Sequence, residues 1–335
     1  MNAEDLTWTD RIRLLLATVT NERSPDAKHV KGYHRPVIEH LLRGELRDAE
    51  RECMHALESN PEDSLLFTLY AIAIWDAGDA KEIRDALQRA HDISNGLCIT
   101  WNAMGDFSGQ IEDKFNAIMA YSLSIAIDED QTLPRKLLFV YYSDAKLWDE
   151  GIRQCREIIR IEPYDSGTWG NLELCLSKLD DTARAEQVAH EMTKSYPDNY
   201  LSWWVQGTVQ LHLEKWDETE YSARRAIQLN REDAECYQLL ALSFLFRNLF
   251  SAAIKSFRKA VTLKPNDGGA WYNLGAALLM DGKLEEADKA LERLAVLDPE
   301  LDRELAEQNL KKLINGGGFQ FYRRTQGSER ESASV

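Results

Sequence analysis

Proline is scarce in this chain, at 8 of 335 residues. Hydrophobic residues make up 44% of the sequence and charged residues 29%, so there is enough apolar material to order a long core. This composition excludes a disordered chain and favours helices.

Cysteine is also rare, and its spacing matches no ligand motif. The five cysteines form an odd set without a C-x-x-C pair, so nothing indicates a disulfide framework, a zinc site or a redox motif. We interpret them as reduced packing thiols and expect a cytoplasmic protein. They are Cys53, Cys98, Cys155, Cys175 and Cys236.

No long hydrophobic run is present. The longest apolar stretch near the amino terminus, residues 14–17, is too short for a secretory signal or a membrane span. We therefore expect neither export nor a membrane partner.

Positive charge is in deficit. The chain has 40 basic against 56 acidic residues, and its formal charge of −16 repels phosphate backbones. No basic stripe offsets this repulsion, so we expect no nucleic-acid partner.

Catalytic motifs are missing as well. The seven histidines form no H-E-x-x-H and no paired zinc spacing, and there is no G-x-S-x-G or glycine-rich phosphate loop. The sequence therefore predicts a protein that is not an enzyme, with no catalytic residue, no metal and no cofactor.

A fixed period of thirty-four positions is the strongest feature that is present. Aromatic residues recur at this spacing and prolines repeat it: Trp169, Trp203, Tyr237 and Trp271, with Pro163, Pro197, Pro265 and Pro299. Each period holds two apolar stretches at helical spacing around a breaker, such as Asp281-Gly282, which predicts a helix-turn-helix. So short a unit cannot bury its own apolar face and must stack on neighbours.

Eight such units fit residues 30–301 without an insertion. The last of them follows the pattern W-x-x-L-G … A … F … P with Trp271, Leu274, Gly275, Ala287, Leu291 and Pro299. The array therefore resembles the tetratricopeptide repeat family. The resemblance implies an all-α fold, a right-handed α-solenoid (superhelix) of about eight helix-turn-helix repeats.

Two segments flank the array. Residues 1–29 predict an N-terminal capping helix and linker, because Thr7 to Asp10 form a capping box before an amphipathic stretch that ends near Thr20. Residues 302–314 predict a C-terminal capping helix, which solenoids need to cover their last apolar face. Residues 315–335 predict a disordered tail.

In the family, the first helix of each repeat lines a concave groove that holds a ligand. The resemblance implies that the groove of this chain consists of His34, Arg35, Thr68, Ile72, Trp75, Asn102, Asp106, Lys136, Val140, Asn171, Leu174, Trp204, Thr208, Gln238, Leu242, Phe246, Tyr272, Asn273 and Met280.

Two specialised forms of this groove do not fit. A carboxylate clamp needs Lys at position five and Asn at position nine of a repeat, and here the one such lysine, Lys136, is followed by Val140. An asparagine ladder needs Asn at position six throughout, and only Asn171 and Asn273 supply it. The groove that remains is apolar and aromatic, so we expect a protein partner that presents an apolar or aromatic peptide or helix.

Two pairs of residues break the repeat pattern. Gln206 and Gln210 occupy positions where apolar residues are expected, and either bond neighbouring helices or point into the groove. Gly105 and Gly109 lie inside a predicted helix, where each costs roughly 1 kcal/mol relative to alanine. We expect a flexible joint there.

These features predict a non-enzymatic protein–protein interaction scaffold or chaperone-like adaptor that binds a peptide or helical segment in its concave groove. The alternative is a structural assembly subunit that uses its convex face or its tail. The aromatic and basic start of the tail, residues 319–324, also suggests self-association or occupation of the chain's own groove.

Overall fold

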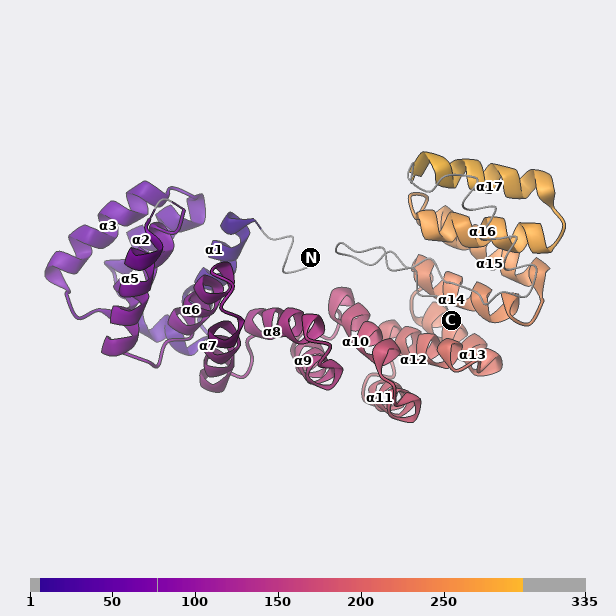
Figure 1. Cartoon of the computed structure of the whole chain (residues 1–335), viewed down its shortest axis with the longest axis horizontal. Helices are drawn as coiled ribbons and strands as arrows, with labels where there is room; N and C mark the ends of the chain where they lie inside the picture. Colours follow the sequence, from indigo (N-terminus) through magenta and orange to yellow (C-terminus); the bar gives the residue numbers. More distant parts are fainter. Residues whose placement is uncertain (1–6, 77, 298–335) are drawn as a thin grey trace. The chain divides into compact units, whose positions relative to one another are not determined.

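The computed structural model describes residues 7–76 and 78–297. Within these residues the chain forms seventeen α-helices, one short 3-10 helix and no strand (Figure 1). The predicted all-α class is confirmed. The last residues of the eighth repeat, the predicted capping helix 302–314 and the tail 315–335 lie outside the described residues.

The chain divides into two compact units, residues 1–175 and 176–335, which are described separately here. The N-terminal unit contains α1 (Trp8–Thr20), the 3-10 helix η2 (Pro25–His29), α2 (His34–Arg43), α3 (Leu46–Ser59), α4 (Ser64–Ala73), α5 (Ala80–Ile93), α6 (Cys98–Gln110), α7 (Lys114–Ile127), α8 (Leu133–Asp144), α9 (Trp148–Ile161) and most of α10 (Ser166–Lys178). The C-terminal unit contains α11 (Thr182–Ser195), α12 (Tyr200–His212), α13 (Trp216–Leu229), α14 (Ala234–Leu245), α15 (Phe250–Leu263), α16 (Gly268–Met280) and α17 (Leu284–Leu297).

From α2 onward the helices form pairs, and each pair repeats the one before it. The even-numbered helices are the first helices of the pairs, and the odd-numbered ones from α3 to α17 are the second helices. The second helices all have the same length, 14 residues. They also begin at a constant interval, as Leu46, Ala80 and Lys114 do. The period in the sequence is therefore the period of the helix pairs.

Carboxylate and amide side chains start several first helices. Asp63, Asn199, Asp233 and Asp267 each accept a hydrogen bond from a backbone N–H two or three residues further on. This contact satisfies one of the N–H groups that the first helical turn leaves unpaired.

A left-handed residue ends six of the first helices in the described chain. It is glycine at Gly44 and Gly282, and a larger residue at Glu112, Lys146, Glu214 and Asn248. After Gly44, for example, the N–H of Glu45 reaches back to the carbonyl of His40 at 2.9 Å. This closing bond turns the chain sharply into the second helix.

Small residues let the two helices of a pair approach closely. Five alanines at the same position of the second helices are buried: Ala49, Ala117, Ala185, Ala253 and Ala287. Because they share one place in the period, they account for the small residue found at this position in the sequence pattern.

Gly105 and Gly109 on α6 are packing residues. A Cβ atom on Gly105 would lie 2.5 Å from the ring of Tyr121, and one on Gly109 would lie 2.5 Å from the hydroxyl of Tyr141. Real Cβ atoms do not approach other atoms so closely. The glycines therefore make room for these two tyrosines, and the flexible joint expected here stays a prediction.

Candidate binding surface

The first helices line one face of each unit. Some neighbouring first helices contact each other: α2 contacts α4, α4 contacts α6, and α12 contacts α14. Among the described residues, no two successive second helices approach each other as closely. We call the side lined by first helices the inner face and the side lined by second helices the outer face. Most of the predicted groove residues lie on first helices, whereas Trp75 and Phe246 follow the ends of α4 and α14.

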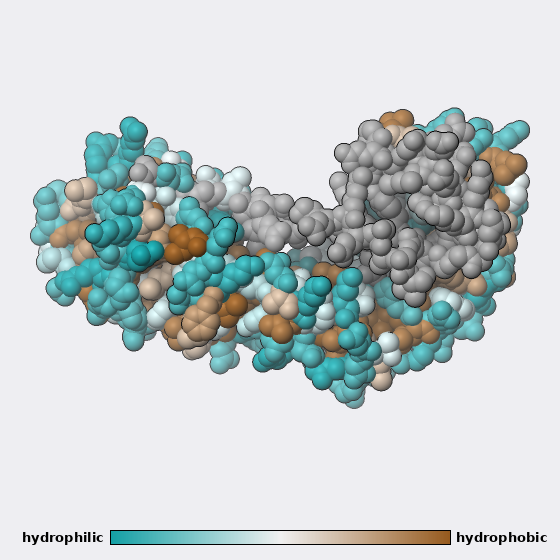
Figure 2. Space-filling view, viewed as in Figure 1, coloured by the Kyte–Doolittle hydropathy of each residue, from teal (hydrophilic) through white to brown (hydrophobic). Residues whose placement is uncertain are grey.

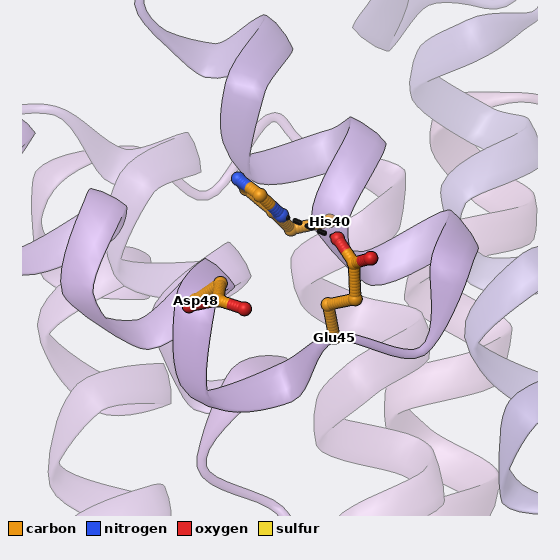
Figure 3. A group of neighbouring side chains, drawn as sticks. All are labelled: His40, Glu45 and Asp48. Atoms are coloured by element: carbon orange, nitrogen blue, oxygen red, sulfur yellow. Dashed lines mark hydrogen bonds and ion pairs between the residues drawn. The ribbon is translucent and has the colours of Figure 1, made fainter.

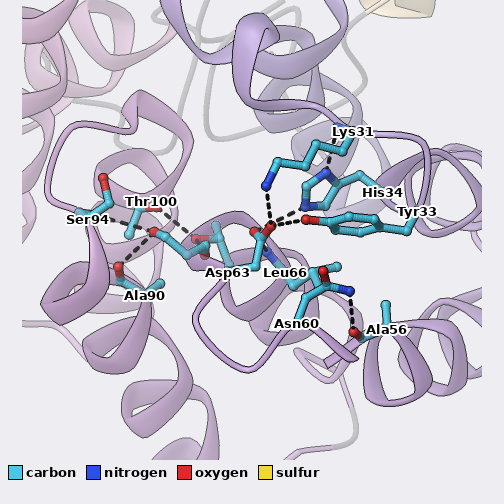
Figure 4. A network of polar contacts seen from close by, with 12 residues as sticks. Lys31, Tyr33, His34, Ala56, Asn60, Asp63, Leu66, Ala90, Ser94 and Thr100 are labelled. Carbon is cyan, nitrogen blue, oxygen red and sulfur yellow. Dashed lines mark hydrogen bonds and ion pairs between the residues drawn. The ribbon is translucent and has the colours of Figure 1, made fainter. Parts of the chain in front are cut away.

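Asp63 is the centre of a polar network on the inner face of the N-terminal unit (Figure 4). Its carboxylate forms hydrogen bonds with Nε2 of the His34 ring at 3.1 Å and with the hydroxyl of Tyr33 at 2.7 Å. It also accepts the backbone N–H of Leu66 and so caps α4. Lys31 lies 3.9 Å away. Burial opposes ionisation of Asp63, but these hydrogen bonds outweigh it and hold the pKa of the carboxyl well below its usual value.

The same contact recurs along the chain. In three later repeats the residue that corresponds to His34 bonds the residue that corresponds to Asp63, one or two positions before the next first helix. Asn102 donates to Gln131 at 2.8 Å, Lys136 pairs with Asp165 at 2.9 Å, and Gln238 donates to Asp267 at 3.1 Å. These predicted ligand residues therefore hold the start of the next repeat.

The N-terminal helix α1 lies across the inner face of its unit. It contacts the first helices α2 and α6, and its apolar side is buried through Ile12, Leu15, Leu16 and Val19. The same apolar cluster includes Ile38 of α2, Ile72 of α4, Phe107 of α6 and Trp75 in the turn after α4. The sequence predicted a capping helix in residues 1–29, and in the structure α1 packs against α2 of the first repeat as well as against α6.

A charged contact fixes α1 to α6. Arg11 pairs with Asp106 at 3.3 Å, and the hydroxyl of Tyr121 donates to the same carboxylate oxygen at 2.6 Å. Burial raises the pKa of Asp106 even though Arg11 and Tyr121 favour its ionised form. The predicted groove residue Asp106 is therefore occupied by the chain's own N-terminal helix.

The 3-10 helix η2 completes this cover. The carboxylate of the fully buried Asp26 accepts the backbone N–H groups of Cys98 at 2.9 Å and Ile99 at 2.7 Å, at the start of α6. Burial raises the pKa of Asp26, and the two backbone hydrogen bonds oppose this rise. Asp26 thus caps a helix that lies far along the sequence.

In the C-terminal unit, three large apolar side chains on or next to first helices are only partly covered. Trp204 on α12, Phe246 just after α14 and Met280 on α16 pack against a core whose residues come from α12 to α17. The ring of Phe246 is stacked on that of Trp216, with their centroids 4.6 Å apart. These three side chains are the half-buried apolar members of the predicted groove in this unit.

The predicted groove residues differ in exposure. Those that are buried are His34, Thr68, Ile72, Trp75, Asn102, Asp106, Thr208, Leu242, Tyr272 and Asn273. Those that are half-buried are Lys136, Val140, Asn171, Leu174, Trp204, Gln238, Phe246 and Met280, and Arg35 is exposed. Lys136 also pairs with Glu162 at 2.9 Å, so two carboxylates of the chain already hold its ammonium group.

The two glutamines of the sixth repeat bond neighbouring helices, which was the first of the two alternatives. Thr193 on α11 donates to Gln206 at 2.6 Å, and Ser222 on α13 donates to Gln210 at 2.7 Å. These bonds satisfy amide oxygens in the core of the C-terminal unit.

His40, Glu45 and Asp48 gather at the turn between α2 and α3 (Figure 3). Their potential ligand atoms lie within 4.8 Å of one another, and His40 Nδ1 is 2.7 Å from Glu45. An imidazole and two carboxylates are ligands that zinc accepts. However, Arg51 pairs with Asp48 and Arg43 lies 4.0 Å from Glu45, so arginines already supply positive charge to this group.

Sequence reasoning missed Arg11 and Asp26. Both act on α6, far along the chain, and no local pattern marks a long-range cap or ion pair. A buried acid beside Ser24 and Pro25 looks like an ordinary turn residue in the sequence. As to membranes, none of the helices in the described parts of the chain has the length and apolar character that a span requires.

Comparison with known families matches residues 239–302 to the sequence model described as Tetratricopeptide repeat. The matched stretch begins inside α14 and continues through α17.

Curated relatives match a larger part of the chain. Human protein O-mannosyl-transferase TMTC1 is 24% identical over 178 residues, which are 52% of this chain and 20% of that protein. The cell division cycle protein 27 homolog of Caenorhabditis elegans is 26% identical over 166 residues, 48% of this chain and 21% of that protein. The chain thus spans about a fifth of the length of these relatives.

Among solved structures, MamA residues 41 to the end from Desulfovibrio magneticus RS-1 has a TM-score of 0.40 at 20% identity. The match covers 51% of this chain and 97% of that one.

Proposed function

We propose that this chain, a tetratricopeptide repeat protein, is a non-enzymatic protein–protein interaction scaffold that binds an apolar helix of a partner on the inner face of its C-terminal unit. Buried free thiols favour a reducing compartment, and we place the scaffold in the cytoplasm.

The observation that carries the proposal is the position of α1. In the N-terminal unit, an amphipathic helix buries its apolar side against first helices, and a single ion pair fixes its orientation. The inner face of that unit is therefore suited to a helix. Helices of the same kind line the C-terminal unit, so we assign their inner face to a helix from another protein.

The chemistry of the C-terminal surface defines the partner. Trp204, Phe246 and Met280 offer large, half-buried apolar side chains, which are the kind that dominate binding energy at protein interfaces. Apolar residues at i, i+3, i+4 and i+7 would match them, as Ile12, Leu15, Leu16 and Val19 do in α1.

The roles of two polar pairs support the proposal of a scaffold without enzymatic activity. The His34–Asp63 pair caps a helix, and the His40–Glu45 pair belongs to an ion-pair group with arginines. Both histidine–carboxylate pairs therefore have structural roles.

The test is affinity purification from the native lysate with quantitative mass spectrometry. Trp204→Ala combined with Met280→Ala should reduce recovery of the specific partner at least roughly tenfold, because alanine removes the apolar anchors. Tyr221→Ala removes an exposed aromatic side chain from the outward side of α13 and should leave recovery unchanged. Equal recovery with both variants, at equal thermal stability, would contradict the proposal.

A further inference from the structure

The outer face of α7 is apolar and exposed. Phe115, Met119 and Leu123, four residues apart and thus on one side of the helix, are 72%, 46% and 38% exposed. Ser122 and Ala126 complete this surface, and no charged residue occurs from 115 to 127. We call these five residues the α7 stripe. Figure 2 shows apolar side chains at the surface over α7.

The other second helices provide an internal comparison. Each of the other seven second helices has five residues equivalent to the α7 stripe, at multiples of one repeat period along the sequence. In every one of these seven helices at least two of the five equivalent residues are charged. The helices on either side are the most charged of the N-terminal unit at these positions. α5 has Lys81, Asp85, Gln88, Arg89 and Asp92, and α9 has Asp149, Arg153, Arg156, Glu157 and Arg160.

An apolar stripe between two charged helices has the composition of an interface core with a polar rim. A solvated outer face would carry charges on α7 as well, as its neighbours do. The stripe therefore indicates contact with another protein surface.

We propose that the α7 stripe is the centre of a homodimer in which α7 packs in parallel against α7 of a second copy. The two-fold axis is parallel to α7 and passes between the two α7 helices. This rotation reverses the order of α5, α7 and α9, so α5 of one copy lies opposite α9 of the other.

Charge complementarity supports this occupant. In the proposed arrangement the equivalent positions of α5 and α9 face each other, and four pairs of opposite charge result: Lys81 with Asp149, Asp85 with Arg153, Arg89 with Glu157, and Asp92 with Arg160. Symmetry produces each pair twice. Every charged stripe position of α5 thus meets the opposite sign.

An antiparallel dimer would use other charge pairs. A two-fold axis across the middle of the stripe would set α5 on α5 with its direction reversed, so Lys81 would face Asp92 and Asp85 would face Arg89 of the second copy. Only the parallel dimer pairs Asp85 with Arg153, so a charge swap at these two positions distinguishes the arrangements.

The ion pairs that these arginines form within one copy do not prevent them from pairing with the second copy. Arg89 lies 3.2 Å from Glu62, Arg153 lies 2.8 Å from Glu150, and Arg160 lies 2.8 Å from Asp130. All three are solvent-exposed pairs, which contribute little and exchange partners readily.

The first test is sedimentation equilibrium of the full chain. We expect a dimer, and Phe115→Asp should raise its dissociation constant by roughly a hundredfold or more, because two carboxylates would enter the apolar centre. The control is Val296→Asp on α17, a 70% exposed residue at the position that Ala126 has in α7. It should leave the dimer unchanged.

The second test is a charge swap that reports the pairing. Asp85→Arg and Arg153→Asp should each weaken the dimer by about tenfold, and the double variant should restore it, because each symmetric pair is then inverted. A wild-type monomer at every concentration would overturn the proposal and leave the stripe to a different protein. A dimer that is insensitive to Phe115→Asp, or a double variant weaker than both single ones, would also overturn it.

Discussion

The indole N–H of Trp169 donates to the carbonyl of Pro163 at 2.8 Å, from a side chain with no exposed surface. The same bond joins Trp203 to Pro197 and Trp271 to Pro265, always across six residues. At these three positions the aromatic and proline periods of the sequence are two ends of one contact. It ties α10, α12 and α16 to the end of the preceding second helix.

Trp169→Phe should destabilise the protein by roughly 2–3 kcal/mol, because it removes this hydrogen bond and leaves a small cavity in place of a fully buried indole. Trp203→Phe should cost less, since Trp203 is half-buried and water can replace the lost donor. Urea unfolding of both variants measures the difference. Equal costs would show that burial of the indole is not the decisive factor.

Gly105→Ala should destabilise the N-terminal unit by about 1–3 kcal/mol, because the new Cβ would meet the Tyr121 ring. The matched control is Gly170→Ala on α10, where a Cβ has nothing within 4 Å. Alanine there should stabilise the helix by roughly 0.5–1 kcal/mol. Thermal unfolding checks both, and two effects of the same sign would refute the packing role of Gly105.

Asp63→Asn should change how stability depends on pH. The pKa of Asp63 is lowered in the folded chain, so its ionised form stabilises the fold above the ordinary value of 3.8, and this contribution is lost as pH falls below it. The variant should be less stable than wild type at neutral pH, with a difference that shrinks in acid. Urea midpoints at several pH values test this, with the exposed Asp76→Asn as control for net charge.

Lys146→Gly should stabilise the protein by up to about 1 kcal/mol. Lys146 has a φ of 56°, a left-handed conformation that costs a residue with a Cβ more than it costs glycine. Gly282, at the same position in the last pair, has a φ of 76° and needs no such correction. Gly282→Lys should therefore be destabilising, and chemical unfolding of the two reciprocal variants measures both effects.

The sequence predicted the helix pairs well because their causes are local or repeated. A capping box at Thr7 and Asp10, alanines at one position of the second helices, and a breaker between the helices each act within one repeat. Residues spaced by a fixed period also support one another, since an error in one unit is corrected by the next. The start of α1 at Trp8 follows directly from its cap.

The placement of α1 could not be predicted in the same way. Its amphipathic pattern shows that one side must be buried, but several apolar surfaces of the chain would satisfy that need. The choice depends on Arg11 meeting Asp106 and on Asp26 meeting the start of α6, contacts that span 95 and 72 residues. Sequence periodicity carries no information about such pairings.

The groove residues were only partly predictable for a related reason. Position five of the repeat was expected to face a ligand, yet His34 and Gln238 bond the caps of the following helices. Whether a polar side chain turns to a ligand or to its own chain depends on the residue before the next helix, which differs from repeat to repeat.

Amide hydrogen exchange along α1 tests the central claim most directly, namely that the inner face of the N-terminal unit holds an apolar helix. Amides from Ile12 to Val19 should be as strongly protected as those of α6, and Asp106→Ala should reduce the protection of α1 before that of α9. Exchange of α1 in the wild type at the rate of an unfolded peptide would contradict the account.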